Sequence, residues 1–342
     1  MNSYPKRVWI AAGIVAVTVV GLWLFTSLFQ AILILFAGII LAVFLTQLSH
    51  LLAELTSLKY ETAFTLVVIT LLTLMIGGGY LMGNQIVEQI GKLTKELQSS
   101  SDSLLNRLEN NQIYQNVIQG NGKSSDITKR LFSTVQTTIS FTLSAFGGFI
   151  LFLFLGFYFA YQSQLYRDGV RLLFPDQLHE RFDEICDRLY NSLWKWMLGR
   201  LFSMVIITIG SIIGLYFLNI PVPITLGVIA GLLTFIPNFG PVIAAIPPML
   251  IGLQQGVDVA LYVAIYYTGL QFVESYFLTP FVAEHQVALP PVITLSCQLV
   301  FGTLAGVLGV LLAEPLAVVT MLLVQEIYLI DTLGRDPSEA RT

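Results

Sequence analysis

The sequence predicts an all-α, polytopic membrane protein with about seven or eight spans, some of them broken or re-entrant hairpins. Hydrophobic residues make up 55% of the 342-residue chain, charged residues only 11%, and the mean hydropathy is +0.77. A soluble chain carries about 25% charged residues, so this one cannot cover a water-facing surface. Its apolar residues also gather in runs of about 20, which as helices would cross the ~30 Å hydrocarbon core of a bilayer.

Residues 1–82 are predicted to hold three membrane helices. The apolar runs 8–26 and 28–48 lie so close together that we expect a tight hairpin, and a third run covers 62–82. Lys6 and Arg7 precede the first run as in a signal peptide, but the run is long and lacks a clear cleavage site, so we expect it to be retained. The two basic residues favour a cytoplasmic N-terminus.

Two charged segments are predicted to lie outside the bilayer core. Residues 83–138 form an extramembrane helical insertion, because apolar residues from Ile86 to Leu108 recur at heptad-like spacing. Its helices either pack on each other or bind a partner as a coiled coil. After a fourth span at 139–161, residues 162–200 are predicted to form an amphipathic helix on the membrane surface. With a cytoplasmic N-terminus, the first segment would lie outside the cell and the second inside.

The predicted surface helix has one apolar and one charged side. The apolar stripe comprises Leu178, Phe182, Ile185, Leu189, Leu193 and Trp196. The charged side comprises Glu180, Arg181, Asp183, Glu184, Asp187 and Arg188.

Residues 201–330 are predicted to form a core with broken helices, followed by a polar tail at 331–342. From residue 201 to residue 334 there is no Lys or Arg, but six acids remain: Asp258, Glu274, Glu284, Glu314, Glu326 and Asp331. A buried carboxylate needs a cationic partner, a bound cation or a proton. We expect water at span ends to solvate Asp258, Glu326 and Asp331. Because this region offers no basic partner, we expect a proton or cation to neutralise Glu274 and Glu314.

The apolar segment 222–254 is interrupted at its centre by Pro237, Asn238, Gly240 and Pro241. One helix of that length would measure ~50 Å, too long for a single span, so two half-helices that meet at a turn are expected. Proline lacks an amide donor and glycine permits positive φ, which leaves backbone groups that need protein or a cavity around them. Broken helices at mid-membrane bind ions and small solutes in transporters; a purely structural kink is the alternative.

A similar unit follows downstream. Residues 258–280 form a predicted span, and the long apolar stretch 290–330 is interrupted by Gly302, Gly306, Gly309 and Pro315. The sequences Pro223-Ile-Thr-Leu and Pro291-Val-Ile-Thr-Leu open the two units alike. The units could therefore form an inverted repeat, although one short match in apolar sequence is a weak signal.

Four stretches carry a resemblance to a known family. They are FIPNFGPVIAAIP from Phe235, QFVESYFLTP from Gln271, LPPVITL from Leu289 and GVLGVLLAEPL from Gly306. In order and spacing they resemble the autoinducer-2 exporter family of membrane permeases, and the resemblance covers nearly the whole chain. It implies export of a small molecule such as a quorum-sensing signal, or cation or proton antiport for some members. Glu274 matches a frequent family glutamate, whereas Glu314 departs from the small or apolar residue that is usual there.

The predicted substrate or ion pathway combines these features. It comprises Glu274, Gln271, Asn238, Pro237, Gly240, Pro241, Thr234, Gln298 and Glu314. Glu274 is expected to bind the coupling proton or sodium ion, with Gln271 on the same helical face; alternatively, Glu274 caps a helix end in water. Asn238, Thr234 and Gln298 can hydrogen-bond a hydroxylated solute, or else join helices to one another.

Other classes of function lack their residues. No GxSxG, Walker A or GxGD motif is present, so an enzyme is not expected and transport would use an ion gradient. His50, His179 and His285 have no metal-ligand spacing, the cysteines Cys186 and Cys297 form no CxxC pair, and no basic stripe suits nucleic acid. No cofactor is expected beyond the coupling proton or sodium ion.

The sequence therefore predicts a secondary transporter, a permease in the bacterial inner (cell) membrane that exports a small molecule by proton or sodium coupling. Small residues in the first spans, such as Ala37-Gly38, and the heptad pattern favour a homo-oligomer. The alternative is a non-transporting membrane scaffold that recruits partners through residues 83–138.

Overall fold

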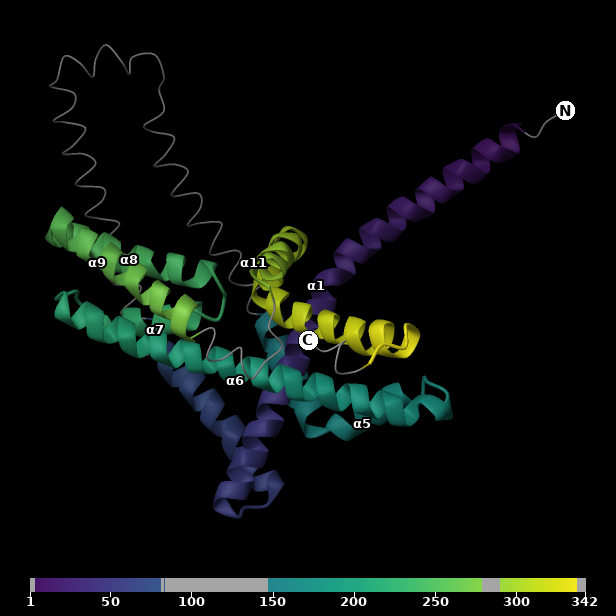
Figure 1. Ribbon diagram of the computed structural model, residues 1–342, viewed down its shortest axis with the longest axis horizontal. Helices are drawn as coiled ribbons and strands as arrows, with labels where there is room; N and C mark the ends of the chain where they lie inside the picture. The colour runs from purple at the N-terminus through teal and green to yellow at the C-terminus, as the bar shows by residue number, and fades with distance from the viewer. Residues whose placement is uncertain (1–3, 81–82, 84–146, 279–289, 337–342) are drawn as a thin grey trace, which may run out of the picture. The chain divides into compact units, whose positions relative to one another are not determined.

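The computed structural model describes residues 4–80, 83, 147–278 and 290–336, and within these ranges the chain is helical without a β-strand (Figure 1). Four of the described helices are long and apolar enough to cross a membrane, or five if one bent pair counts as a single span. Two shorter apolar helices add to them. These observations confirm the prediction of a polytopic all-α membrane protein. Apart from Gly83, the predicted insertion at 83–138 lies outside the described residues, and so does the start of the predicted fourth span.

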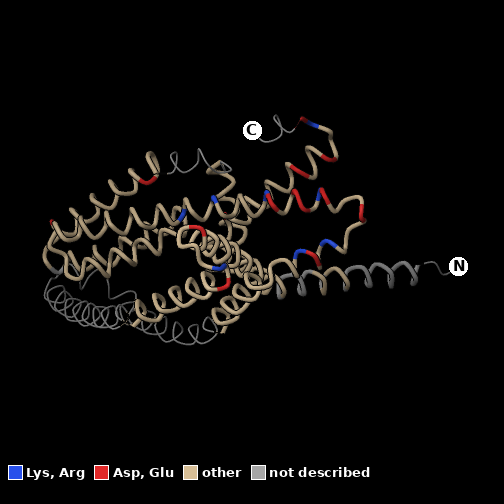
Figure 2. Tube along the Cα trace, turned by 90° about the horizontal axis from the view of Figure 1, so that it is seen from below, with Lys and Arg blue, Asp and Glu red and all other residues tan. Residues whose placement is uncertain are grey.

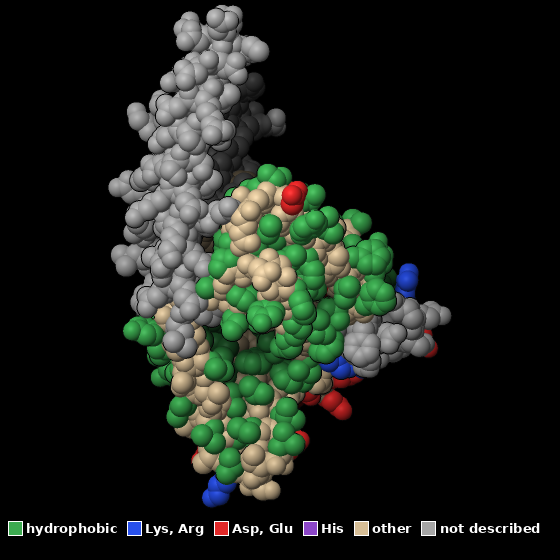
Figure 3. Space-filling model, turned by 90° about the vertical axis from the view of Figure 1, so that its left-hand side faces the viewer, with side chains coloured by type: hydrophobic (Ala, Val, Ile, Leu, Met, Phe, Trp, Pro, Cys, Tyr) green, Lys and Arg blue, Asp and Glu red, His purple; other side chains and the backbone are tan. Residues whose placement is uncertain are grey.

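The chain divides into two compact units. Unit 1 comprises Met1–Tyr60, Leu151–Leu201 and Thr279–Thr342, and unit 2 comprises Glu61–Ile150 and Phe202–Leu278. Many large apolar side chains are exposed, for example Leu74, Ile76 and Phe217, and hydrophobic side chains cover much of the described surface in Figure 3. Such a surface fits lipid as the surrounding solvent.

Helix α1 corrects one prediction. It runs from Tyr4 to Thr56 as one helix of 53 residues, so the expected hairpin between 8–26 and 28–48 is wrong. The reason lies at Ser27, the only residue between the two apolar runs, because it neither fixes φ nor favours a turn as proline or glycine would. The chain turns instead at Ser57, whose φ is 55°, and then enters the helix Tyr60–Tyr80.

Unit 1 contains α1, the helix that ends at Tyr161, α5 (Ser163–Arg171) and the short 3₁₀ helix η1 (Asp176–Leu178). It also contains the first half of α6 (His179–Phe217), α11 (Pro291–Leu323) and the π-helix η3 (Val324–Thr332). Gly38 of α1 is part of a close helix contact, since a Cβ there would lie 2.9 Å from Leu155 Cβ. Gly156 is equally close to Leu41, so these small residues serve packing within the chain.

Helix α6 is continuous across residue 200, where the sequence predicted a surface helix followed by a separate span. No proline interrupts the segment, and Gly199 alone does not end a helix. The apolar stripe becomes more buried toward its C-terminal end, where Leu193 and Trp196 are each 4% exposed. One helix therefore carries both the charged segment and the apolar run that follows.

Unit 2 contains the second half of α6, α7 (Pro223–Leu233), α8 (Phe239–Gln255), α9 (Val257–Val273) and the π-helix η2 (Glu274–Leu278). Its core comprises Ile207, Leu215, Ile220, Leu226, Ala230, Ala244, Ile251, Val263 and Tyr267. Helices α8 and α9 pack against each other after a turn at Gly256, whose φ is 152°. A Cβ on Gly252 would lie 3.2 Å from the Ala260 backbone, so the two helices approach closely.

Both predicted breaks are present. Helix α7 ends at Leu233 and α8 begins at Phe239, with Asn238 at a φ of 65°. In α11 the helical backbone breaks at Ala305 and Gly306, while Pro315 is accommodated without a break.

A glycine closes each of these two hairpins. A Cβ on Gly240 would overlap the Leu233 carbonyl, and a Cβ on Gly309 would overlap the Phe301 carbonyl. Thr225 and Thr294, in the two matching sequence motifs, are both buried. The two units therefore contain hairpins of the same construction, which supports the proposed repeat.

Candidate functional site

Glu274 is the buried carboxylate of unit 2. It is 6% exposed and stands where α9 passes into η2. Val263 and Tyr267, on the same side of α9, are also buried, and Gln271 is half-buried. The spacing of four, four and three residues places all of them on one helical face. The buried face of α9 therefore changes from apolar to polar toward Glu274.

The α7–α8 break lies at the same end of unit 2 as Glu274. Gly252 and Ala260, which face each other, are each four residues from Gly256. Asn238 and Glu274 are each eighteen residues from Gly256. In this antiparallel register they are therefore expected at the same height along the axes of α8 and α9. Helices α7, α8 and α9 lie side by side in Figure 1. Within unit 2 the fold thus brings the break toward the acidic end of α9.

The residues of the break differ in what they offer a solute. Thr234 is fully buried, and its hydroxyl donates a hydrogen bond of 2.8 Å to the carbonyl oxygen of Ala230. Asn238 is exposed, and its side chain does not cap α8. Gly240 is buried and Pro237 and Pro241 are half-buried. Asn238 is therefore the exposed polar side chain at this turn.

Gln298 and Glu314, the other two predicted pathway residues, belong to α11 and therefore to unit 1. Gln298 is 2% exposed. Glu314 accepts a hydrogen bond from Nη2 of Arg200, and the two side chains are 17% and 13% exposed. The expectation that a proton or cation neutralises Glu314 is wrong, because an arginine of α6 pairs with it.

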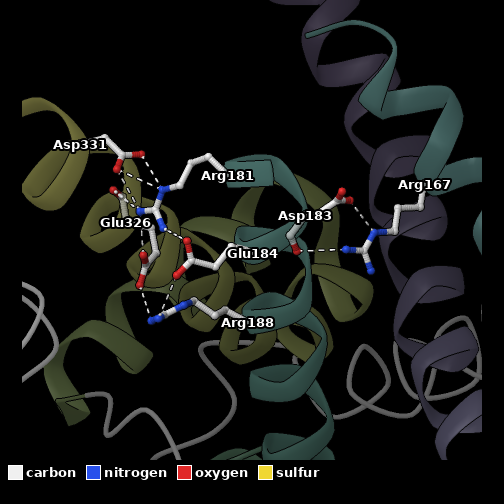
Figure 4. Close-up of polar contacts among 7 residues, drawn as sticks. All are labelled: Arg167, Arg181, Asp183, Glu184, Arg188, Glu326 and Asp331. Atoms are coloured by element: carbon white, nitrogen blue, oxygen red, sulfur yellow. Dashed lines mark hydrogen bonds and ion pairs between the residues drawn. The ribbon is translucent and has the colours of Figure 1, made fainter. Parts of the chain in front are cut away.

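Glu326 overturns a second expectation. It was predicted to lie in water near a span end, but it is 2% exposed and pairs with two arginines. Arg181 Nη2 lies 2.9 Å from Oε2 of Glu326, and Arg188 Nη1 lies 2.9 Å from Oε1 (Figure 4). The prediction considered only residues 201–334, whereas α6 places arginines from the preceding segment beside η3.

Two further carboxylates complete this network. Arg181 also binds Asp331 at 2.9 Å, and Glu184 binds Arg181 at 2.7 Å and Arg188 at 3.2 Å. The residues Arg181, Glu184 and Arg188 are spaced by three and four, so they share one face of α6. We call Arg181, Glu184, Arg188, Glu326 and Asp331 the charge cluster.

Other charges of α6 bind a different helix. Arg167 of α5 donates to Asp183 at 3.0 Å and to Asp187 at 2.5 Å. Figure 2 shows acidic and basic residues close together along the helices drawn at the right. Several side chains assigned to the charged side of the amphipathic helix are thus bound by protein partners. Arg181 and Arg188 are seven residues apart and lie on one face of α6, so the sequence indicated that they could bind a common partner. It could not indicate Glu326, because that residue is about 140 residues away in the chain.

Within the ranges that the structure describes, no three His, Cys, Asp or Glu side chains gather in a way that could hold a metal ion. The rings of His50 and Tyr60 are in contact, with centroids 4.6 Å apart and a tilt of 34°, and a ring nitrogen of His179 lies 3.0 Å from the Phe174 carbonyl oxygen. These histidines have structural contacts, and His285 lies outside the described residues.

Comparisons with known proteins point to one family. The model of the AI-2E family transporter matches residues 13–328. YrrI of Bacillus subtilis (strain 168) is 33% identical over 162 residues, which are 47% of this chain and 46% of YrrI. YdbI of the same organism is 22% identical over 309 residues, 87% of this chain and 86% of YdbI. Both are named for a proposed role in transport, and the match to YrrI spans about half of its length.

Proposed function

The chain belongs to the AI-2E family of transporters, and we propose that it is a secondary transporter that exports a small molecule by coupling to a proton or sodium gradient. That it is an integral membrane transporter follows from the family and from its apolar helices. The direction of transport, the solute and the coupling are our proposal. The solute class we propose is a small hydroxylated signal of the quorum-sensing kind.

One observation carries this proposal. Glu274 is buried at the end of α9, at the level of the helix break at 234–238. Placing a carboxylate inside a protein is unfavourable unless hydrogen bonds, a proton or a bound cation compensate its charge, and a proton or sodium ion is what a coupled transporter can exchange there. A helix break supplies backbone groups that are not used by helical hydrogen bonds. The two features together suit a site that binds a coupling ion beside a solute.

Asn238 and Gln271 are the proposed solute contacts in this arrangement. Asn238 is exposed at the break, and its amide can donate and accept hydrogen bonds. Gln271 donates to Ser275 at 3.3 Å, one turn along the same helix as Glu274. Pro237, Gly240, Pro241 and Thr234 shape the turn. Gln298 and Glu314 belong to unit 1 and are proposed as pathway residues of that unit by itself.

We test the coupling with the purified protein in proteoliposomes that contain a pH-sensitive dye. Sodium or proton gradients are imposed on wild type and on Glu274→Gln. We expect the variant to lose gradient-driven dye response by at least about tenfold, because glutamine cannot exchange a proton. Asp258→Asn is the matched control, since Asp258 is an exposed acid on the same helix.

The control variant should keep the wild-type response. Equal responses of wild type and Glu274→Gln, with both proteins folded, would refute coupling through Glu274. We also propose a multi-pass protein of the bacterial inner membrane, a homo-oligomer, with its N-terminus cytoplasmic beside Lys6 and Arg7.

A further inference from the structure

The charge cluster joins two segments that are about 140 residues apart in the chain. Arg181, Glu184 and Arg188 lie near the start of α6, and Glu326 and Asp331 lie on η3, which continues α11 (Figure 4). Glu326 is 2% exposed, whereas Asp331 is 38% exposed and Arg181 24%. The cluster therefore has a buried centre and a more exposed edge.

The π-helical conformation of η3 places both of its acids against Arg181. Residues five apart in an α-helix point about 140° away from each other around the axis, because each residue adds about 100°. A π-helix has i→i+5 hydrogen bonds, so residues five apart are about one turn apart and share a side. The Leu333 amide donates to the Tyr328 carbonyl, five residues earlier, at 3.0 Å. Glu326 and Asp331 have this same separation of five residues.

The same geometry defines a second arrangement. If η3 became α-helical while Glu326 stayed in place, Asp331 would rotate away from Arg181. Removing Glu326 from its arginines would leave a buried unpaired charge, which is strongly unfavourable. Asp331 can leave more easily, since water reaches it. The cluster thus has a fixed pair of contacts at Glu326 and a releasable contact at Asp331.

We propose that the charge cluster is a conformational latch: Glu326 keeps the end of α11 on α6, while Asp331 holds the C-terminal end of η3 against Arg181 when η3 is π-helical and releases it when η3 becomes α-helical. Opening the latch would free the chain after Glu326 to move during the transport cycle, while Glu326 keeps the end of α11 in place. This inference rests on the proposed function only in assigning the motion to transport.

The latch is tested by measuring the distance between η1, which directly precedes α6, and the chain just after η3. Spin labels are attached at Gln177→Cys and Arg335→Cys, both exposed positions, in a protein whose Cys186 and Cys297 are replaced by serine. Pulsed electron paramagnetic resonance in liposomes reports the distance distribution. We expect Asp331→Asn to raise the long-distance population several-fold over the parent protein.

A second variant is designed to favour the closed latch, in which Asp331 stays bound to Arg181. Deletion of Tyr328, which is 55% exposed, brings Glu326 and Asp331 to a spacing of four, at which they share a face of an ordinary α-helix. We expect this protein to stay at the short distance and to transport several-fold more slowly. Arg167→Gln is the matched control. It removes the ion pairs of α5 with Asp183 and Asp187 of α6, and it should leave the distance distribution unchanged.

The proposal is overturned if Asp331→Asn gives the parent distribution, or if Arg167→Gln opens the distance as much as Asp331→Asn does. It is also overturned if the Tyr328 deletion transports at the parent rate while its label distance is unchanged. Thermal unfolding confirms that each variant is folded. These distances do not depend on Glu274, so an unaffected Glu274→Gln variant would refute the proposed coupling and leave the latch test intact.

Discussion

The buried and half-buried carboxylates of the two units have different surroundings. In unit 1, arginines of α6 bind Glu314 and Glu326. In unit 2, the described residues include no Lys or Arg, and Glu274 is buried at a helix end beside a break. An arginine that pairs with a carboxylate joins two segments of the chain, so Glu314 and Glu326 contribute to the structure of unit 1. We propose that Glu274, buried at a helix end, takes part in the transport cycle instead.

The largest effect is expected when the arginine of a half-buried ion pair is removed. Arg200→Met should lower the free energy of unfolding by about 3 kcal/mol, because it leaves the half-buried Glu314 without that partner. Chemical unfolding in mixed micelles measures the loss. The double variant Arg200→Met/Glu314→Leu should regain most of it, and equal losses in the single and double variants would contradict the structural role of the pair.

A smaller effect is expected where the units resemble each other. Gly240→Ala and Gly309→Ala should each cost about 2 kcal/mol of stability, because the added Cβ overlaps a backbone carbonyl across the hairpin. Gly269→Ala is the control, since that position is open. Thermal unfolding of the three variants makes the comparison. A loss in only one hairpin would show that the two are not built alike.

The smallest effect is expected at the more exposed ion pairs. Arg167 is 36% exposed, and Arg167→Gln should change the free energy of unfolding by only about 0.5–1 kcal/mol. High salt should reduce even this difference. Unfolding curves at low and high ionic strength are the measurement. A loss as large as that of Arg200→Met would mean that exposure does not separate the two kinds of pair.

The sequence was most informative where structure follows from local chemistry. Pro237 and Gly240 mark the α7–α8 break, and Gly306 marks the break in α11, because these residues restrict or free the backbone where they stand. The α1 hairpin was predicted from two apolar runs, but hydropathy does not show whether the residue between them turns the chain. Ser27 does not.

The arginine partners were missed for another reason. Glu326 and its arginines are brought together by packing between distant segments, and no local pattern encodes such a pairing. Within the candidate site, the sequence indicated Glu274 and the break separately. Their common level follows from the turn at Gly256, which a sequence pattern alone does not fix.

The continuity of α1 also changes how crossings of the membrane are counted. A helix of 53 residues is ~80 Å long and cannot turn back, so it crosses the ~30 Å core once rather than twice. With one crossing fewer, every later loop lies on the opposite side of the membrane from the side predicted. If the predicted spans at 62–82 and 139–161 each cross once, the N-terminus and the segment 162–200 face opposite compartments. A cytoplasmic N-terminus would thus place the arginines of α6 on the far side of the membrane.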